Sequence, residues 1–206
     1  MPDGVLSGGR NVSLLTHLDM PGGGQVWVDE TTLYVAHMRP PHGTTIVDVA
    51  DPRNPRVLHH IPIPPGWHSH KVRAANGLMI VNHEKFGAGN EEFGGGLMIY
   101  DVRDPAQPKE VAKIAMPGKG AHRFTFDGTL LYTSATDAGF TGAFPAIWDL
   151  SDPARPREVM RWWIPGQHAA AGERDDMPEG WPAPRCHHPM RLGDRLHVSY
   201  WHHGMW

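Results

Sequence analysis

Four segments of the sequence place an imidazole or an amide at the same position of a repeated pattern. They cover residues 24–27, 66–72, 120–124 and 185–190. Alignment of the segments brings into one column the residues Gln25, His70, His122 and His188. Imidazole titrates near neutral pH and is the commonest metal ligand among side chains. A histidine that returns in successive repeats therefore predicts one shared centre, to which each repeat contributes a ligand.

The three histidines of this column are the predicted metal ligands. His70, His122 and His188 could hold one divalent transition metal and leave coordination positions open for a substrate. Imidazole binds iron, copper and zinc, so the residue type does not choose among these metals. The alignment leaves one alternative open in the fourth segment, because His187 directly precedes His188.

Four further residues are predicted to act around this centre as catalytic groups, namely His83, Glu84, Arg123 and His203. Glu84 could orient a ligand histidine by accepting the N–H of its second ring nitrogen. Arg123 directly follows a column histidine and could neutralise an anionic substrate, as could Lys71. His83 and His203 are expected farther from the centre, within reach of a bound substrate.

A second repeat indicates the elements that must position these residues. The pattern Asp-Pro-x-x-Pro starts at Asp51, Asp104 and Asp152, and each copy follows an apolar run rich in β-forming residues. Proline lacks an N–H and fits a turn between strands better than the ladder of a sheet. A period of about 50 residues with four strands in each repeat is typical of β-propeller blades. We therefore predict an all-β chain built from four-stranded antiparallel blades.

The repeats make residues 1–206 a single partial propeller of about three and a half blades. The predicted units are 11–21 as a lone outermost strand, 22–64, 65–117 and 118–166 as whole blades, and 167–206 as a partial blade. In a propeller, the histidine column and the ends of the second strands fall on one face. Two long loops, 85–96 and 166–184, fall on that face too. Loops gathered on one face of a rigid scaffold commonly carry binding and catalysis.

The apolar run at 97–102, followed by the turn at 104–108, resembles the signature of the LVIVD-repeat family of β-propeller proteins. The resemblance covers residues 11–206 and implies the fold rather than an activity. The histidine column is more distantly similar to the propellers of selenium-binding proteins (methanethiol oxidases) and of carotenoid-cleavage dioxygenases. There, histidines from several blades hold one metal on the axis, which implies that role for the three column histidines. Gln25 departs from this pattern, and members of these families usually have more blades.

Composition limits the classes of partner. Of the 206 residues, 40% are hydrophobic and 20% are charged, which is typical of a soluble globular domain. The net charge is −3 and no run of Lys or Arg exists, so neither nucleic acid nor a membrane is an expected partner. Cys186 is the single cysteine, and the amino-terminal residues lack the apolar stretch of a signal peptide. A cytoplasmic location and a small-molecule substrate are expected.

The sequence supports two hypotheses on function. The first is a metal-dependent oxidoreductase or oxygenase that acts on a small organic molecule at the histidine centre. The second is a non-catalytic LVIVD-repeat propeller that binds a ligand or a protein through the same face, because propellers host both kinds of function. In either case, we expect the open edge of the partial ring to meet further blades of the same chain or a second copy.

Overall fold

The computed structural model describes residues 11–89, 91–174 and 178–206. The polar start of the chain, on which the expected location depends, and short parts of both long loops lie outside these ranges. Within them, the only helices are two short 3-10 helices, η1 (Glu91–Phe93) and η2 (Ala169–Ala171). None of the described helices has the length and hydropathy needed to cross a lipid bilayer. All other regular structure is β-strand.

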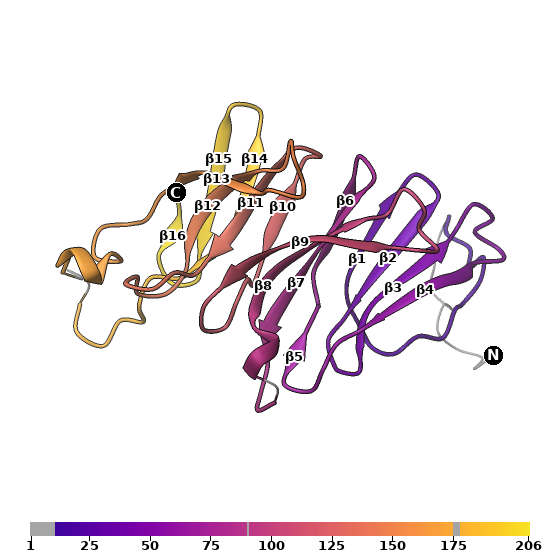
Figure 1. The fold of residues 1–206 in the computed structure, drawn as a ribbon, viewed down its shortest axis with the longest axis horizontal. Coiled ribbons are helices and arrows are strands. Elements are labelled where there is room, and N and C mark those ends of the chain that lie inside the picture. The colour runs from indigo at the N-terminus through magenta and orange to yellow at the C-terminus, as the bar shows by residue number, and fades with distance from the viewer. Residues whose placement is uncertain (1–10, 90, 175–177) are drawn as a thin grey trace.

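The strands form four antiparallel sheets that follow one another in chain order along an arc (Figure 1). The first sheet contains β1 (Gly23–Asp29), β2 (Thr32–His37), β3 (His42–Asp48) and β4 (Arg56–Pro62). The third contains β10 (Phe124–Phe126), β11 (Leu130–Ala135), β12 (Phe144–Asp149) and β13 (Arg157–Arg161). In both sheets each strand pairs with its neighbour in sequence, as in a propeller blade.

The second sheet differs in that its innermost strand is interrupted. Its strands are β5 (Trp67–His68), β6 (Val72–Ala75), β7 (Leu78–Lys85), β8 (Gly95–Asp101) and β9 (Lys109–Met116). Both β5 and β6 pair with β7, and residues 69–71 bulge away between them. The interruption therefore falls on the segment that carries His70.

The fourth sheet has three strands, β14 (Cys186–Leu192), β15 (Arg195–Tyr200) and β16 (Gly204–Met205). The predicted all-β architecture of propeller blades, three whole and one partial, is thus confirmed. Residues 11–21, for which the sequence predicts an outermost strand, have no regular secondary structure. A strand forms only when a neighbouring strand satisfies its backbone groups, and none of the described strands pairs with this segment.

The repeated acidic residues have a local role in the turns. Asp51, Asp104 and Asp152 each accept a hydrogen bond from the backbone N–H two residues ahead, which closes the turn between the third and fourth strands. The Asp that ends each apolar run likewise accepts a hydrogen bond from the backbone N–H two residues ahead. Asp101 is one example, and it also binds the guanidinium of Arg103. The signature residues therefore shape the turns.

The core lies between neighbouring sheets. One apolar cluster joins the second and third sheets, with Ile80, Leu97 and Leu131 fully buried. A second joins the first and second sheets around Ile46 and Met79. Full burial of one such side chain contributes about 1.5–3 kcal/mol. These clusters fix the sheets as rigid neighbours, so that the edges of their inner strands can carry a site.

Candidate metal centre

The segment between β5 and β6 is held by the first sheet, which explains the interruption of the innermost strand. The carbonyl oxygen of Ser69 accepts the N–H of His37 at 3.1 Å, and that of His70 accepts the N–H of Gln25 at 2.9 Å. A Cβ on Gly24 would lie 2.6 Å from the His70 oxygen, so only glycine permits this approach. The backbone of one blade thus presents the histidines of the next.

Glu84 enters the site from β7, which runs directly beside β5. It is the register partner of His68. On its other side Glu84 forms an isolated β-bridge with Gly120, which brings the segment leading to His122 against it. The carboxylate therefore lies between a histidine segment of the second sheet and one that leads into the third.

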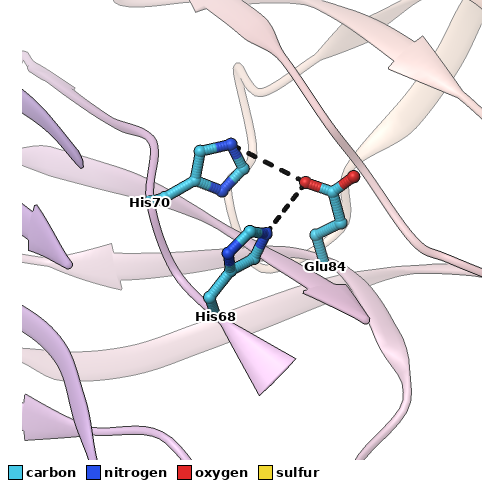
Figure 2. Close-up of side chains that lie close together, drawn as sticks. All are labelled: His68, His70 and Glu84. Carbon is cyan, nitrogen blue, oxygen red and sulfur yellow. Dashed lines mark hydrogen bonds and ion pairs between the residues drawn. The ribbon is translucent and has the colours of Figure 1, made fainter. Parts of the chain in front are cut away.

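Three imidazole nitrogens converge on this carboxylate. Glu84 Oε2 lies 3.0 Å from His68 Nε2, 3.7 Å from His70 Nε2 and 2.9 Å from His122 Nδ1. Figure 2 shows the rings of His68 and His70 side by side with Glu84 facing both. Their ring centroids are 4.0 Å apart, and both side chains are almost fully buried. A buried cluster of this composition is a candidate metal centre.

The distances fit one bound ion. Two ligand atoms that each lie about 2.1 Å from a metal, at angles of about 90° to 120°, are about 3.0–3.6 Å apart. Glu84 Oε2 lies 3.0 Å from His68 Nε2 and 3.7 Å from His70 Nε2, which is close to this spacing, and its 2.9 Å separation from His122 Nδ1 is that of a hydrogen bond. Ligand atoms of His68, His70 and Glu84 all lie within 4.8 Å of one another. These three residues are therefore candidate metal ligands.

The protonation states also suit a metal. Burial alone would raise the pKa of Glu84, but the hydrogen bonds from His122 and His68 lower it to about 2. Burial, together with the nearby His68, lowers the pKa of His70 to about 2. At neutral pH the carboxylate is charged and His70 is neutral, which are the forms that coordinate metals.

Asn82 fixes the orientation of His70. Its Oδ1 accepts the backbone N–H of Lys71 at 2.8 Å, and its Nδ2 donates to the carbonyl of Ala121 at 3.0 Å. The same Nδ2 lies 3.2 Å from His70 Nδ1, so this ring nitrogen is the acceptor. The proton of neutral His70 is therefore on Nε2 and points toward Glu84. Coordination of a metal by Nε2 would therefore require the other tautomer of the neutral ring, with the proton on Nδ1.

The predicted ligand set is only partly brought together. His70 and His122 both lie at Glu84, and their ring centroids are 5.4 Å apart. His188 instead lies against Thr125, with 3.0 Å between its Nε2 and the hydroxyl oxygen. The ring of His187, the alternative left open by the alignment, lies 5.2 Å from that of His122. A register shift between Cys186 and His188 in the pairing of β14 with β15 turns His187 toward the centre.

The other predicted site residues lie at different distances from the histidine cluster. Glu84 is central, and Arg123 donates from Nε to His187 Nε2 at 3.0 Å. His83 is buried against Phe93, and this burial lowers its pKa to about 3. His203 lies beside Trp181 with a ring separation of 5.8 Å, and neither of its ring nitrogens has a hydrogen-bond partner among the described residues.

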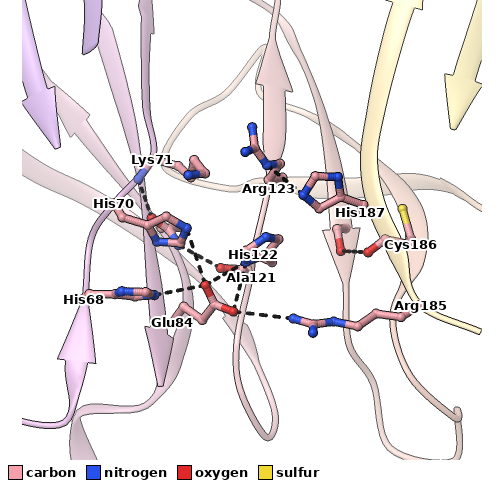
Figure 3. A network of polar contacts seen from close by, with 12 residues as sticks. His68, His70, Lys71, Glu84, Ala121, His122, Arg123, Arg185, Cys186 and His187 are labelled. Carbon is pink, nitrogen blue, oxygen red and sulfur yellow. Dashed lines mark hydrogen bonds and ion pairs between the residues drawn. The ribbon is translucent and has the colours of Figure 1, made fainter. Parts of the chain in front are cut away.

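Two contributors, His68 and Arg185, were not predicted. His68 and His70 form a His-x-His pair, and alternate residues of an extended segment point to the same side. That signal was available in the sequence. Arg185, whose guanidinium lies 3.6 Å from Glu84 Oε1, comes from the loop before β14 and has no local signature. Figure 3 shows how Arg185 reaches Glu84 from across the site.

A cavity of about 470 Å³ opens beside the centre. Its wall includes His122 and Arg185, which both contact Glu84, together with Ser134 and Phe140. Asp137 also lines it, but its carboxylate is engaged by Arg161 at 2.9 Å. The buried centre is therefore reachable by a small molecule from the side of His122.

Comparison with known proteins supports the fold. No protein-family model matches the chain, and no curated protein sequence matches it significantly. The chain is similar in structure to the periplasmic gluconolactonase of Pseudomonas aeruginosa, with a TM-score of 0.53 and 16% identity over 82% of this chain and 47% of the other. A thermostable family-43 glycoside hydrolase matches with a TM-score of 0.40 and 12% identity, over 87% of this chain and 65% of the other. The chain spans about half the length of the gluconolactonase it is similar to.

Proposed function

We propose that this chain carries the metal centre of a β-propeller oxidoreductase or oxygenase that acts on a small organic molecule. The observation that carries the proposal is the convergence of His68, His70 and His122 on the single carboxylate of Glu84. Two histidines and one carboxylate with open positions are typical of non-haem iron(II) oxygenases. Catalytic zinc sites also use two histidines and a carboxylate with an open position, so iron is proposed here from the proposed oxygen chemistry and the donor set itself fits both metals.

Each residue then has a defined task. His68, His70 and Glu84 would hold the ion, and His122 would complete the set or remain hydrogen-bonded to Glu84. A bound transition metal supplies Lewis acidity and, for iron or copper, one-electron chemistry. Phe86, which is 55% exposed, stacks on the ring of His68 at a centroid distance of 4.6 Å and covers it from the solvent side. The cavity along His122 and Arg185 admits the substrate.

The likeness to the gluconolactonase and the glycoside hydrolase supports the scaffold alone. Propellers host unrelated chemistries, so a hydrolytic reaction does not follow from the fold. The repeated turn signature supports placing the chain with the LVIVD-repeat proteins as part of the same proposal.

Metal binding tests the proposal directly. Purified metal-free protein titrated with Fe(II), Cu(II) or Zn(II) in a calorimeter should bind one ion per chain. Glu84→Gln should weaken binding at least tenfold, because an amide replaces the only carboxylate in the set. Glu179→Gln, in an exposed loop, is the matched control. Equal binding by both variants would remove the basis of the proposal.

Oxygen consumption then separates an enzyme from a binding module. The iron-loaded protein is mixed with small phenols, thiols and unsaturated organic acids while an oxygen electrode records uptake. Uptake that depends on iron and is lost in Glu84→Gln supports the oxidoreductase. Tight metal binding without uptake for any compound favours the non-catalytic propeller.

A further inference from the structure

Three cationic side chains gather on the other side of the histidine cluster from Arg185. Lys71 lies in the segment that leads into β6, Arg73 lies two positions later on β6, and Arg123 directly precedes β10 of the third sheet. Strands β6 and β10 are in contact. Figure 3 shows Lys71 and Arg123 on one side of the histidines and Arg185 on the other. The cations therefore come from adjacent blades and share one region.

Within the described part of the chain these three cations form no direct ion pair, and the negative charge of Glu84 acts on Lys71 from a longer distance. Among the described residues, no carboxylate lies within the 4.0 Å of an ion pair with Lys71, Arg73 or Arg123. Arg73 stacks over Trp27 at 4.4 Å and donates to the carbonyl of Val72. Arg123 uses only Nε, toward His187, and its two terminal nitrogens have no hydrogen-bond partner among the described residues. Donors therefore remain for a further acceptor.

The positive charges of these three side chains also repel one another. Burial and the positive charge of Arg123 lower the pKa of Arg73. Half-buried like charges destabilise a fold unless an anion lies between them. An anion bound between them would offset this repulsion and accept hydrogen bonds from the donors that remain.

We propose that Lys71, Arg73 and Arg123 bind an oxyanion group, a carboxylate or a phosphate, of a small-molecule ligand. Guanidinium groups match the two oxygens of such a group, and the lysine ammonium adds a point charge. His70 and His122 directly precede Lys71 and Arg123, so the bound anion lies next to the candidate metal centre. The substrate of the metal centre therefore carries the oxyanion. This last step rests on the proposed function, whereas anion binding itself does not.

The test measures binding of two simple probes to metal-free protein at low ionic strength. Inorganic phosphate and malonate are titrated by calorimetry into the wild type, Lys71→Met and Arg123→Gln. The control is Arg155→Gln, whose side chain is 88% exposed in a turn of the third sheet. The wild type and the control should bind at least one probe, and each site variant should bind it at least tenfold more weakly. The tighter probe identifies the ligand as a phosphate or a carboxylate.

Thermal unfolding distinguishes binding from a structural role. In buffer without multivalent anions, Lys71→Met should melt at a higher temperature than the wild type, because one opposing charge is gone. Added phosphate or malonate should raise the melting temperature of the wild type and not that of the variant. If Lys71→Met and Arg123→Gln bind both probes as well as Arg155→Gln, or if the wild type binds neither, the proposal is wrong.

Glu84→Gln separates this proposal from the proposed function. It should bind the anion at least as tightly as the wild type, because a negative charge near Lys71 is gone, while losing the metal. Anion binding without any metal binding in the wild type would support the anion site and overturn the metal centre. Metal binding without anion binding would support the metal centre and overturn the anion site.

Discussion

Glu84 Oε2 lies 2.9 Å from His122 Nδ1, although the two residues are 38 positions apart and belong to neighbouring sheets. The contact joins the second strand of one blade to the segment that opens the next. Because His68 donates to the same oxygen, one carboxylate ties three strand segments together. The geometry of the centre therefore depends on how the sheets are placed relative to each other.

The histidines should differ in their effect on metal binding. His68→Ala and His122→Ala each remove a nitrogen within 3.0 Å of Glu84 Oε2, so metal affinity should fall at least tenfold. His188→Ala should change it less than twofold, because the Nε2 of His188 lies at the hydroxyl of Thr125. Calorimetric titration of metal-free protein measures this. An effect of His188→Ala as large as that of His68→Ala would show that the ligand set is different.

Gly120 should be essential for the centre. Its φ is +78°, and an added Cβ would lie 2.3 Å from the carbonyl oxygen of His83. Gly120→Ala must therefore push the segment with His122 away from Glu84, and metal affinity should fall at least tenfold. Gly118→Ala is a matched control, because its φ is +68° but its Cβ would meet nothing within 4 Å. Both variants strain the backbone, and only the first should lose the metal while circular dichroism remains that of the wild type.

The metal-free protein should lose stability in mild acid. Burial, as the largest cause, lowers the pKa of His70 to about 2 and of His187 and His188 to about 4, from an ordinary value of 6.5. Below pH 6.5 the unfolded chain then binds more protons than the folded one, so the free energy of unfolding decreases as the pH falls toward 4. Glu84, with a pKa of about 2, adds to this loss only below about pH 4.5.

Urea unfolding with a chelator present, at pH values from 7.5 to 4.5, measures this slope. His188→Gln should flatten it, because the substituted side chain does not titrate. An unfolding free energy that is constant over this range would contradict the prediction.

The chain should associate through the sheets at the two ends of the arc. Met205 and Trp206 are 66% and 53% exposed beside β15, and Val26 and Val28 on β1 are 59% and 55% exposed. Exposed apolar side chains on unpaired sheets favour pairing with another sheet. Light scattering should show association that depends on concentration, and Met205→Asp should reduce it more than Val159→Asp on β13. A monomer at all concentrations would contradict this expectation.

The strands and turns of this protein could be predicted from sequence because the forces that set them are local. Asp101 closes its turn with a backbone group two residues away, and the positive φ angles of Asn76 and Gly77 make a tight hairpin between β6 and β7. The alternation of apolar residues in each run decides which side chains enter the core. A repeat of such units is visible without any structure.

The composition of the centre depended on the tertiary structure. His70 and His122 were found from their place in the repeat, but a shift of one residue in the pairing of β14 decided between His187 and His188. Arg185 and the group of Lys71, Arg73 and Arg123 have no common sequence motif, because they meet only where the inner strands of different sheets converge. Local sequence determines each strand, whereas the packing of sheets determines which strand edges face one another, and the site is built at those edges.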